Sequence, residues 1–253
     1  MSTALPPRLE EALSSWPLWR PAPSRKPEVT GHLDAGLTND AWLVDAGGKQ
    51  VVVRLNSPFG REFNIDRVRE LYIHRAVSEL GYAPPILYCN IDAGYLVSEF
   101  IAGDVWGDED LHNANNQYNL LCAMTRLQKI PLPFAKFDYW RHLCHYESCL
   151  IRLGVEMARD LRARKARMAE AIQAFQNGGW KPCLVHHDLS AGNIIAREGQ
   201  LFILDWEYAA CGYQGMDFPA FDEGLSEPSV VADLSALINE YWLLLKEQLL
   251  ETA

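Results

Sequence analysis

The sequence lacks the features of secreted and membrane proteins. Its N-terminus has no basic start followed by a long apolar stretch, and no run approaches the roughly twenty apolar residues that a membrane span needs. The six cysteines are scattered and none forms a CxxC pair, which is the pattern expected of reduced thiols. These absences predict a cytoplasmic protein with no membrane partner.

Positive charge is also scarce. The chain has 23 Lys and Arg residues against 33 Asp and Glu residues, a formal net charge of −10. A nucleic-acid partner would require a basic face, so this balance argues against one and favours a cationic substrate. There is no internal repeat and no low-complexity linker. The 253 residues, 49% of them hydrophobic, suit one compact unit or two lobes that share a cleft.

The most informative segment is residues 184–208, LVHHDLSAGNIIAREGQLFILDWEY. It spaces His186, Asp188 and Asn193 as H-x-D-x-x-x-x-N, and a later apolar run ends in Asp205. Phosphoryl transfer needs a group that receives the proton of the attacking hydroxyl, and oxygen ligands that hold magnesium on the nucleotide phosphates. Asp188 fits the first role, and Asn193 and Asp205 fit the second. The segment predicts a kinase that uses ATP and Mg²⁺, although Asp and Asn also commonly cap turns.

The segments HHDLSAGN and LDWEYA resemble the choline/ethanolamine kinase and aminoglycoside phosphotransferase superfamily, which includes bacterial thiamine kinases and is related to the protein kinases. The resemblance implies a bilobal α+β fold, with a small antiparallel-sheet N-lobe and a mostly helical C-lobe. It also implies that Glu207 is a further carboxylate on the metal or the substrate. The alternative for Glu207 is an ordinary acid beside the site. Asp217 resembles the family acid that follows this segment and anchors the catalytic loop.

The first part of the chain predicts an antiparallel sheet. Short alternating apolar segments with turn residues between them indicate five strands, over residues 29–33, 41–44, 50–55, 86–88 and 95–98. Helical spacing over residues 66–80 predicts one helix. Arg54 ends the third strand where a kinase needs a cation on the nucleotide phosphates. Glu70, in the helix, resembles the glutamate that orients this cation; the alternatives are a solvated strand end and an exposed helix glutamate.

The turn between the first two strands, AGLTN, resembles the GGxTN turn of choline kinases. A glycine-bearing hairpin lets backbone amides approach phosphate oxygens, so Gly36, Thr38 and Asn39 are candidate nucleotide contacts. The first glycine of the family turn is Ala35 in this chain.

The segment EFIAG after the last strand resembles the hinge between kinase lobes, and backbone groups of Glu99 and Ile101 are expected to bind adenine. Helical periodicity follows over residues 110–129, 139–175 and 230–250. We therefore predict an N-lobe over residues 1–98 with a proline-rich lead-in over 1–27, a hinge over 99–104, and a C-lobe with the catalytic loop and acceptor site over 105–253.

The acceptor is less constrained than the nucleotide. Trp206 and Tyr208, with other aromatic residues nearby, form either a cage for a cationic headgroup or part of the core. Only 48 residues follow Asp205, which favours a small alcohol such as choline, ethanolamine or thiamine over a bulky antibiotic. The alternatives are a pseudokinase-like module that binds a nucleotide or metabolite without chemistry, and an aminoglycoside-type phosphotransferase. A hydrolase is disfavoured because there is no nucleophile elbow. ATP against GTP and the oligomeric state stay open.

One further cluster has metal-ligand chemistry. His142, His145 and Cys149 recur at the spacing of a helical turn, which suits zinc or an ordinary helix face. No second Cys or His pair lies at zinc-finger distance, so the helix face is favoured.

Overall fold

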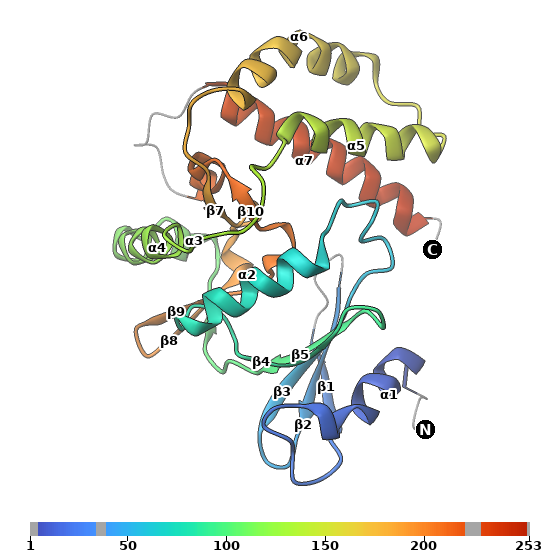
Figure 1. The fold of residues 1–253 in the computed structure, drawn as a ribbon, viewed down its shortest axis with the longest axis vertical. Coiled ribbons are helices and arrows are strands. Elements are labelled where there is room, and N and C mark those ends of the chain that lie inside the picture. Colours follow the sequence, from blue (N-terminus) through green and yellow to red (C-terminus); the bar gives the residue numbers. More distant parts are fainter. Residues whose placement is uncertain (1–4, 34–38, 221–228, 252–253) are drawn as a thin grey trace. The chain divides into compact units, whose positions relative to one another are not determined.

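The five predicted strands form one antiparallel sheet in a computed structural model, which describes residues 5–33, 39–220 and 229–251. Their order is β1-β2-β3-β5-β4 (Figure 1). The strands are β1 Glu28–Leu33, β2 Asp40–Asp45, β3 Gln50–Leu55, β4 Ile86–Asn90 and β5 Tyr95–Glu99. Along β3, buried Val51, Val53 and Leu55 alternate with more exposed residues, because successive side chains of a strand point to opposite faces. The antiparallel N-terminal sheet is confirmed.

The proline-rich lead-in contributes to the core of this sheet. Proline at the first position suits helix α1, Pro7–Ser14, because its missing N–H would have no partner there. Leu9 and Leu13 of α1, together with Trp19, are buried in one cluster with residues of β3 and β5. The lead-in therefore covers the sheet.

Helix α2, Arg67–Glu79, is confirmed within one residue of its predicted ends. It begins at Asp66, whose carboxylate accepts hydrogen bonds from the N–H groups of Val68 and Arg69, both at 3.0 Å. Two residues after its end, Gly81 has a left-handed backbone with φ of 81°, which stops the helix.

The later part of the chain is mostly helical, as expected, but two of the expected helical stretches are broken. The helices are α3 Asp108–Leu111, α4 Ala114–Leu127, α5 Tyr139–Arg152, α6 Arg159–Gln176 and α7 Ser229–Glu251. The prediction of continuous helix over 139–175 is wrong because Gly154 adopts φ of 74° after α5. The stretch over 110–129 is broken at Asn113, whose side chain caps α4.

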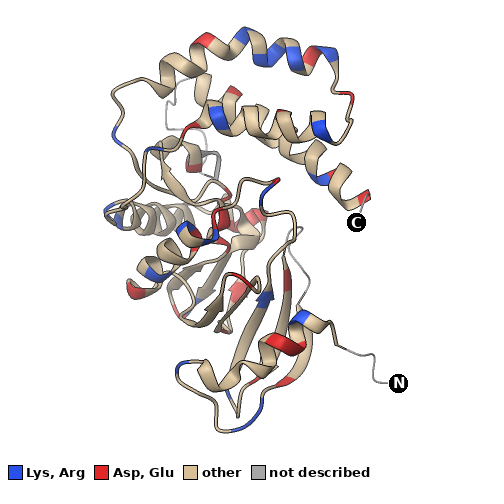
Figure 2. Cartoon of the chain, turned by 45° about the vertical axis from the view of Figure 1, so that its right-hand side comes forward, with Lys and Arg blue, Asp and Glu red and all other residues tan. Residues whose placement is uncertain are grey.

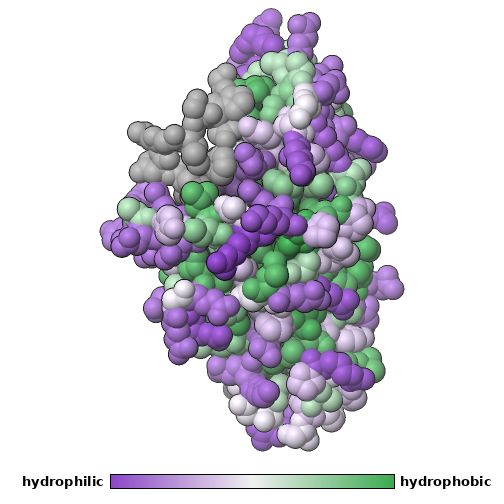
Figure 3. Space-filling view, turned by 60° about the vertical axis from the view of Figure 1, so that its left-hand side comes forward, coloured by the Kyte–Doolittle hydropathy of each residue, from purple (hydrophilic) through white to green (hydrophobic). Residues whose placement is uncertain are grey.

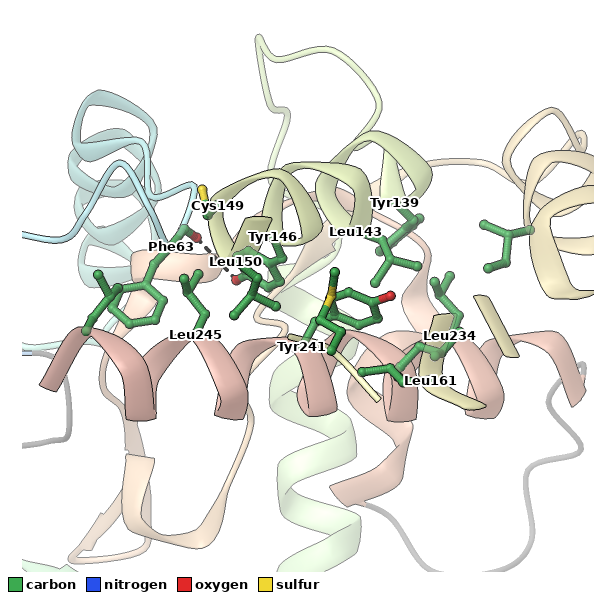
Figure 4. Packing of buried hydrophobic residues seen from close by; sticks show 14 residues of the cluster. Phe63, Tyr139, Leu143, Tyr146, Cys149, Leu150, Leu161, Leu234, Tyr241 and Leu245 are labelled. Atoms are coloured by element: carbon green, nitrogen blue, oxygen red, sulfur yellow. Dashed lines mark hydrogen bonds between the residues drawn. The ribbon is translucent and has the colours of Figure 1, made fainter. Parts of the chain in front are cut away.

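Helices α5 and α7 pack against each other in a hydrophobic cluster of unit 2 (Figure 4). Tyr146 and Leu150 of α5 and Tyr241 and Leu245 of α7 are all at most 1% exposed. The Tyr146 hydroxyl donates to the carbonyl of Phe63 at 3.2 Å, so its polar end is satisfied inside the cluster. Burying each such side chain stabilises the fold by roughly 1.5–3 kcal/mol.

Basic residues gather on α6, which also packs on α5 and α7 (Figure 2). Arg159, Arg162 and Arg167 are exposed, as expected for a solvated face. Lys165 is different, since it is 6% exposed and its ammonium is paired with the Glu147 carboxylate.

Short strands complete the structure: β6 Asp104–Val105, β7 Cys183–Val185, β8 Ile194–Arg197, β9 Gln200–Ile203 and β10 Ala210–Gly212. Contacts between residues divide the chain into two compact units. Unit 1 comprises Met1–Pro58, Leu71–Val105 and Ile194–Leu204, and unit 2 comprises Phe59–Glu70, Trp106–Asn193 and Asp205–Ala253. No helix within the described ranges is both long and apolar enough to cross a membrane. The face shown in Figure 3 mixes hydrophobic with hydrophilic side chains.

Candidate active site

Two short ladders bring the ends of the catalytic segment together. Strand β7 pairs antiparallel with β10, and the pair Val185↔Ala210 puts the residue after β7 beside the residue before β10. Strand β8 pairs antiparallel with β9, and the pair Ile194↔Ile203 puts the residue before β8 beside the residue after β9. The first ladder therefore brings His186, at the start of the catalytic loop, beside Ala209, which follows the DWEY segment.

Asp188 and Asn193 are joined directly within this loop. The side-chain amide nitrogen of Asn193 donates to the Asp188 carbonyl at 2.8 Å and to its carboxylate Oδ2 at 3.3 Å. Asn193 ends a short 3₁₀ helix, Ala191–Asn193, and its own N–H donates to the Ser190 carbonyl at 3.1 Å. The chain thus folds back between these two residues, which are five positions apart, and their side chains are in contact.

The Asp188 carboxylate is open to solvent, yet the protein around it removes part of its water. This desolvation raises the pKa of Asp188 to about 6, with a smaller contribution from the negative charge of Glu207, while the hydrogen bond from Asn193 acts in the opposite direction. A carboxylate with a pKa near neutral pH is ionised in the cell and still basic enough to accept a proton.

Asp217 holds the start of the catalytic loop. Its two carboxylate oxygens accept the backbone N–H groups of His186 and His187, at 2.9 and 2.8 Å. Burial raises the pKa of Asp217 to about 7, against these two hydrogen bonds, which favour the ionised form. The anchoring role implied by the family resemblance matches this geometry.

His187 is locked in one neutral form by its neighbours. Its Nδ1 lies 3.1 Å from the Tyr208 carbonyl, which can only accept, so Nδ1 carries the hydrogen. Its Nε2 then accepts from the Tyr139 hydroxyl at 3.0 Å, and that oxygen accepts the N–H of Tyr213 at 2.9 Å. Burial lowers the pKa of His187 to about 3. Its backbone is left-handed, with φ of 67°.

Gly212 makes room for this arrangement. A Cβ at this position would lie 2.6 Å from the Tyr139 hydroxyl and 2.8 Å from Nε2 of His187. The close approach requires glycine.

Asp205 connects β9 to the 3₁₀ helix Trp206–Tyr208 through a left-handed backbone with φ of 58° and ψ of 63°. Such a conformation in a residue other than glycine costs roughly 1–3 kcal/mol and persists where the surrounding structure imposes it. Asp205 follows the buried run that ends at Ile203, with Leu204 between them.

Glu207 is buried and paired with a residue that sequence reasoning did not single out. Nη1 of Arg67 donates to the Glu207 carboxylate at 2.9 Å and to the Glu70 carboxylate at 2.8 Å. The Glu207 side chain is 0% exposed and that of Glu70 is 2% exposed. One guanidinium therefore bridges the DWEY segment and the start of α2.

Comparison with known proteins identifies the family of the chain. The model of the phosphotransferase enzyme family matches residues 31–220. The chain belongs to the phosphotransferase enzyme family. No match was found among curated proteins.

Solved structures similar to this phosphotransferase share its fold. The choline kinase LicA from Streptococcus pneumoniae has a TM-score of 0.69 and 16% identity, covering 94% of this chain and 91% of its own. A choline/ethanolamine kinase family protein from Mesorhizobium loti has a TM-score of 0.66 and 18% identity, covering 94% and 84%. The ADP-bound aminoglycoside phosphotransferase APH(2'')-Ib has a TM-score of 0.55 and 19% identity, covering 94% and 82%. At these identities the likeness shows the kinase-like fold.

The donor set at this phosphotransferase's catalytic loop fits magnesium. Among the described residues, no group of three or more His, Cys, Asp or Glu is arranged to hold a metal ion. Magnesium, however, usually takes one or two protein carboxylates and fills its shell with phosphates and water. The amide nitrogen of Asn193 faces Asp188, which turns its oxygen, the metal-binding atom, to the other side. Asn193 and Asp205 would hold the ion, whereas Glu207 is engaged by Arg67.

Among the predicted nucleotide residues that the structure describes, Asn39, Arg54, Glu99 and Ile101 lie in unit 1 of the phosphotransferase, and Glu70 lies in unit 2. Arg54 donates to the side-chain oxygen of Asn56 at 3.1 Å, and Asn39, 8% exposed, accepts the N–H of Ser57 at 3.2 Å. Gly36 and Thr38 lie outside the described residues.

Backbone hydrogen bonds connect the segment that is expected to bind adenine to residues in or beside the N-terminal sheet. The N–H groups of Glu99 and Phe100 donate to the carbonyls of Pro85 and Gln50, at 2.9 and 3.2 Å. The side chain of Ile101 is 5% exposed, in a cluster with residues of the β8–β9 hairpin.

The aromatic residues of the DWEY segment are packed inside unit 2. Trp206 is 0% exposed with its ring 4.7 Å from that of His186, so in this structure it offers no surface on which a substrate can stack. Tyr208 is half-buried, and its hydroxyl accepts from Nε1 of Trp242 at 2.8 Å.

The His142 cluster has the contacts of an ordinary helix face. Nε2 of His145 lies 2.9 Å from the Arg61 carbonyl, so it carries a hydrogen. His142 accepts from the Asn64 amide at 2.8 Å through Nδ1. Cys149 lies 3.5 Å from His145.

Proposed function

We propose that this phosphotransferase transfers the γ-phosphate of ATP, with Mg²⁺, to the hydroxyl of a small cationic metabolite such as choline, ethanolamine or thiamine. The observation that carries the proposal is the Asp188–Asn193 pair. The Asp188 carboxyl, whose pKa is raised to about 6, accepts a hydrogen bond from the Asn193 amide. The register of the β8–β9 pair puts Asp205 at the same end of this hairpin as Asn193.

In the proposed reaction Asp188 accepts the proton of the acceptor hydroxyl as its oxygen bonds to the γ-phosphorus. The bond between that phosphorus and the bridging oxygen breaks, and ADP leaves. Asn193 holds Oδ2 of Asp188, which leaves Oδ1 to meet the hydroxyl. Mg²⁺, held by Asn193 and Asp205, would neutralise phosphate charge, and Arg54 would bind phosphate oxygens. Adenine would bind to backbone groups of Glu99 and Ile101, as the resemblance implies.

One feature supports a cationic acceptor. The formal net charge of −10 attracts cations over the whole protein.

The test is ADP release by the purified protein with ATP, Mg²⁺ and one alcohol at a time. Choline, ethanolamine and thiamine form one arm, and simple sugars and aminoglycosides form two others. We expect turnover with a cationic small alcohol, and Asp188→Asn should lower kcat by about 10²–10⁴-fold, the usual contribution of a general base. Asp138→Asn is the matched control, because Asp138 caps α5 and asparagine caps equally well.

The outcomes separate the candidate functions. Turnover with aminoglycosides alone would assign the acceptor class named by the structures of the APH(2'') enzymes. A Mg²⁺-dependent rise in melting temperature with ATP, and no transfer to any alcohol, would indicate a binding module. Full activity of Asp188→Asn would rule out the proposed mechanism.

A further inference from the structure

Helix α1 lies outside the part of the chain that the family model matches, which begins at residue 31. It nevertheless reaches the end of β3, where Arg54 lies. Nη1 of Arg8 donates to the Asn56 carbonyl at 3.0 Å, and Nη2 donates to the Gly94 carbonyl at 2.6 Å. These two carbonyls come from the end of β3 and from the β4–β5 turn.

The turn that contains Gly94 leaves room for the Arg8 guanidinium. Gly94 has φ of 72°, and a Cβ there would lie 2.5 Å from Nη2 of Arg8, so only glycine leaves room for this contact. The N–H of Asn56 donates to the Gly94 carbonyl at 2.8 Å, which ties the two turns to each other. We call the Asn56 and Gly94 turns, joined by this hydrogen bond, the joint. Arg8 adds two further hydrogen bonds to it.

The same joint supports Arg54. Asn56 is 7% exposed, and its side-chain oxygen accepts from Nη2 of Arg54 at 3.1 Å. The backbone of Asn56 is held by Arg8 and Gly94, and its side chain in turn fixes one edge of the Arg54 guanidinium. Long side chains lose rotamer freedom when they bind, so a guanidinium fixed in advance binds an anion more tightly.

We propose that Arg8 is a positioning residue for nucleotide binding: it fixes Asn56, and Asn56 orients the Arg54 guanidinium toward the phosphates. The inference rests on the proposed function in one respect, that Arg54 binds the phosphates of ATP. It adds a role for the N-terminal segment, which acts through Arg54 and touches no substrate itself.

The test measures ATP affinity by calorimetry on the whole chain, without an acceptor. Arg8→Ala should raise the Kd for ATP about tenfold, equivalent to ~1.4 kcal/mol. In the separate ADP-release assay, the KM of the acceptor should be unchanged. Arg8→Lys should fall between, because an ammonium lacks the planar fork that reaches both carbonyls. Arg20→Ala is the matched control: Arg20 also donates to two carbonyls of the lead-in, those of Pro17 and Trp19, but has no link to Arg54. It should bind ATP as the wild type does.

A double-mutant cycle distinguishes positioning from general stability. In an Arg54→Ala background, Arg8→Ala should cause no further loss of ATP affinity, because the group that it positions is gone. An equal loss in both backgrounds, or wild-type affinity in Arg8→Ala, would overturn the inference while leaving the kinase proposal intact. If wild-type protein binds no ATP, the proposed function itself fails. Should Arg8→Ala not fold, Arg8→Lys, for which a smaller loss of ATP affinity is expected, takes its place in the same cycle.

Discussion

A single nitrogen of Arg67 serves two buried carboxylates, those of Glu70 and Glu207, which are 137 residues apart in the sequence. Arg67 is itself 13% exposed at its side chain, so water screens these interactions weakly. Buried charges persist where they are paired and hydrogen-bonded. Arg67 therefore fixes the position of Glu207 beside the catalytic loop, whose Asp188 senses the charge of Glu207 in its raised pKa.

Replacing Arg67 should destabilise the protein. Arg67→Ala removes this partner from two buried acids, and breaking a buried pair typically costs about 3–5 kcal/mol. Arg67→Lys keeps the charge and should cost less. Urea unfolding measures both, with exposed Arg141→Ala as the control, expected within about 0.5 kcal/mol of wild type. Unfolding free energies within 1 kcal/mol of wild type for Arg67→Ala would show that the bridge does not stabilise the fold.

The roles of individual residues were predictable only where residue type and spacing specify chemistry. Asp188, Asn193 and Asp205 form such a pattern, and the structure joins the first two directly. Arg67 gave no signal, because an arginine near the start of a helix is usually solvated and its second partner lies far away in the sequence. Trp206 was predicted as a possible substrate contact from its neighbourhood, but burial depends on tertiary packing that the local sequence does not contain.

At the scale of elements, the start of the catalytic loop is held by Asp217. This residue reaches back from a 3₁₀ helix, Gln214–Ala220, to the first two residues after β7. The loop leaves β7 through a left-handed residue, His187, which needs external support.

Asp217→Asn should loosen this loop. The amide has one acceptor oxygen, so it can satisfy one of the two N–H groups and sets its own NH₂ against the other. An unsatisfied buried donor costs about 1–3 kcal/mol. We expect a lower melting temperature and a kcat at least tenfold lower, with a smaller change in ATP affinity. Asp233→Asn, on the exposed side of α7, is the control. Wild-type kcat in Asp217→Asn would show that the loop does not need this anchor.

Element types were predictable and their breaks were not. Five strands and α2 follow from alternation and capping, since Asp66 and Gly81 are local signals. The end of α5 at Gly154 was missed because an isolated glycine inside a helical pattern is often tolerated. The burial of α1 against β3 depends on contacts between distant segments, so the lead-in looked irregular.

For the whole molecule, the sequence specified an α+β chain with a sheet first and helices after it. It placed the β8–β9 hairpin in the C-lobe because that hairpin follows the catalytic loop. By contacts the hairpin groups with the sheet: the Ile203 N–H donates to the Tyr82 carbonyl at 2.7 Å, and the Gln200 side chain donates to Gly81 at 2.6 Å. The local periodicity of a sequence does not predict a contact between two residues that are 119 positions apart, such as Gly81 and Gln200.

Acid should destabilise the protein through two buried histidines. Burial lowers the pKa values of His142 and His187 to about 3, below their ordinary value of 6.5. Each accepts a hydrogen bond at one ring nitrogen, from Asn64 and from Tyr139, which protonation of that nitrogen would break. The unfolded chain binds these protons first, so stability is complete above pH 6.5 and falls as the pH decreases from about 6.5 towards 3.

Each histidine should add a slope of about 1.4 kcal/mol per pH unit to the free energy of unfolding within that window. Urea unfolding from pH 7.5 to 5 measures it. His142→Gln, whose side-chain oxygen can still accept from Asn64, should lower the slope by the contribution of one histidine, about 1.4 kcal/mol per pH unit. His112→Gln, at an exposed histidine, should leave it unchanged. A slope in His142→Gln equal to that of the wild type would mean that His142 binds its proton as readily in the folded protein as in the unfolded chain, contrary to its burial and its bond from Asn64.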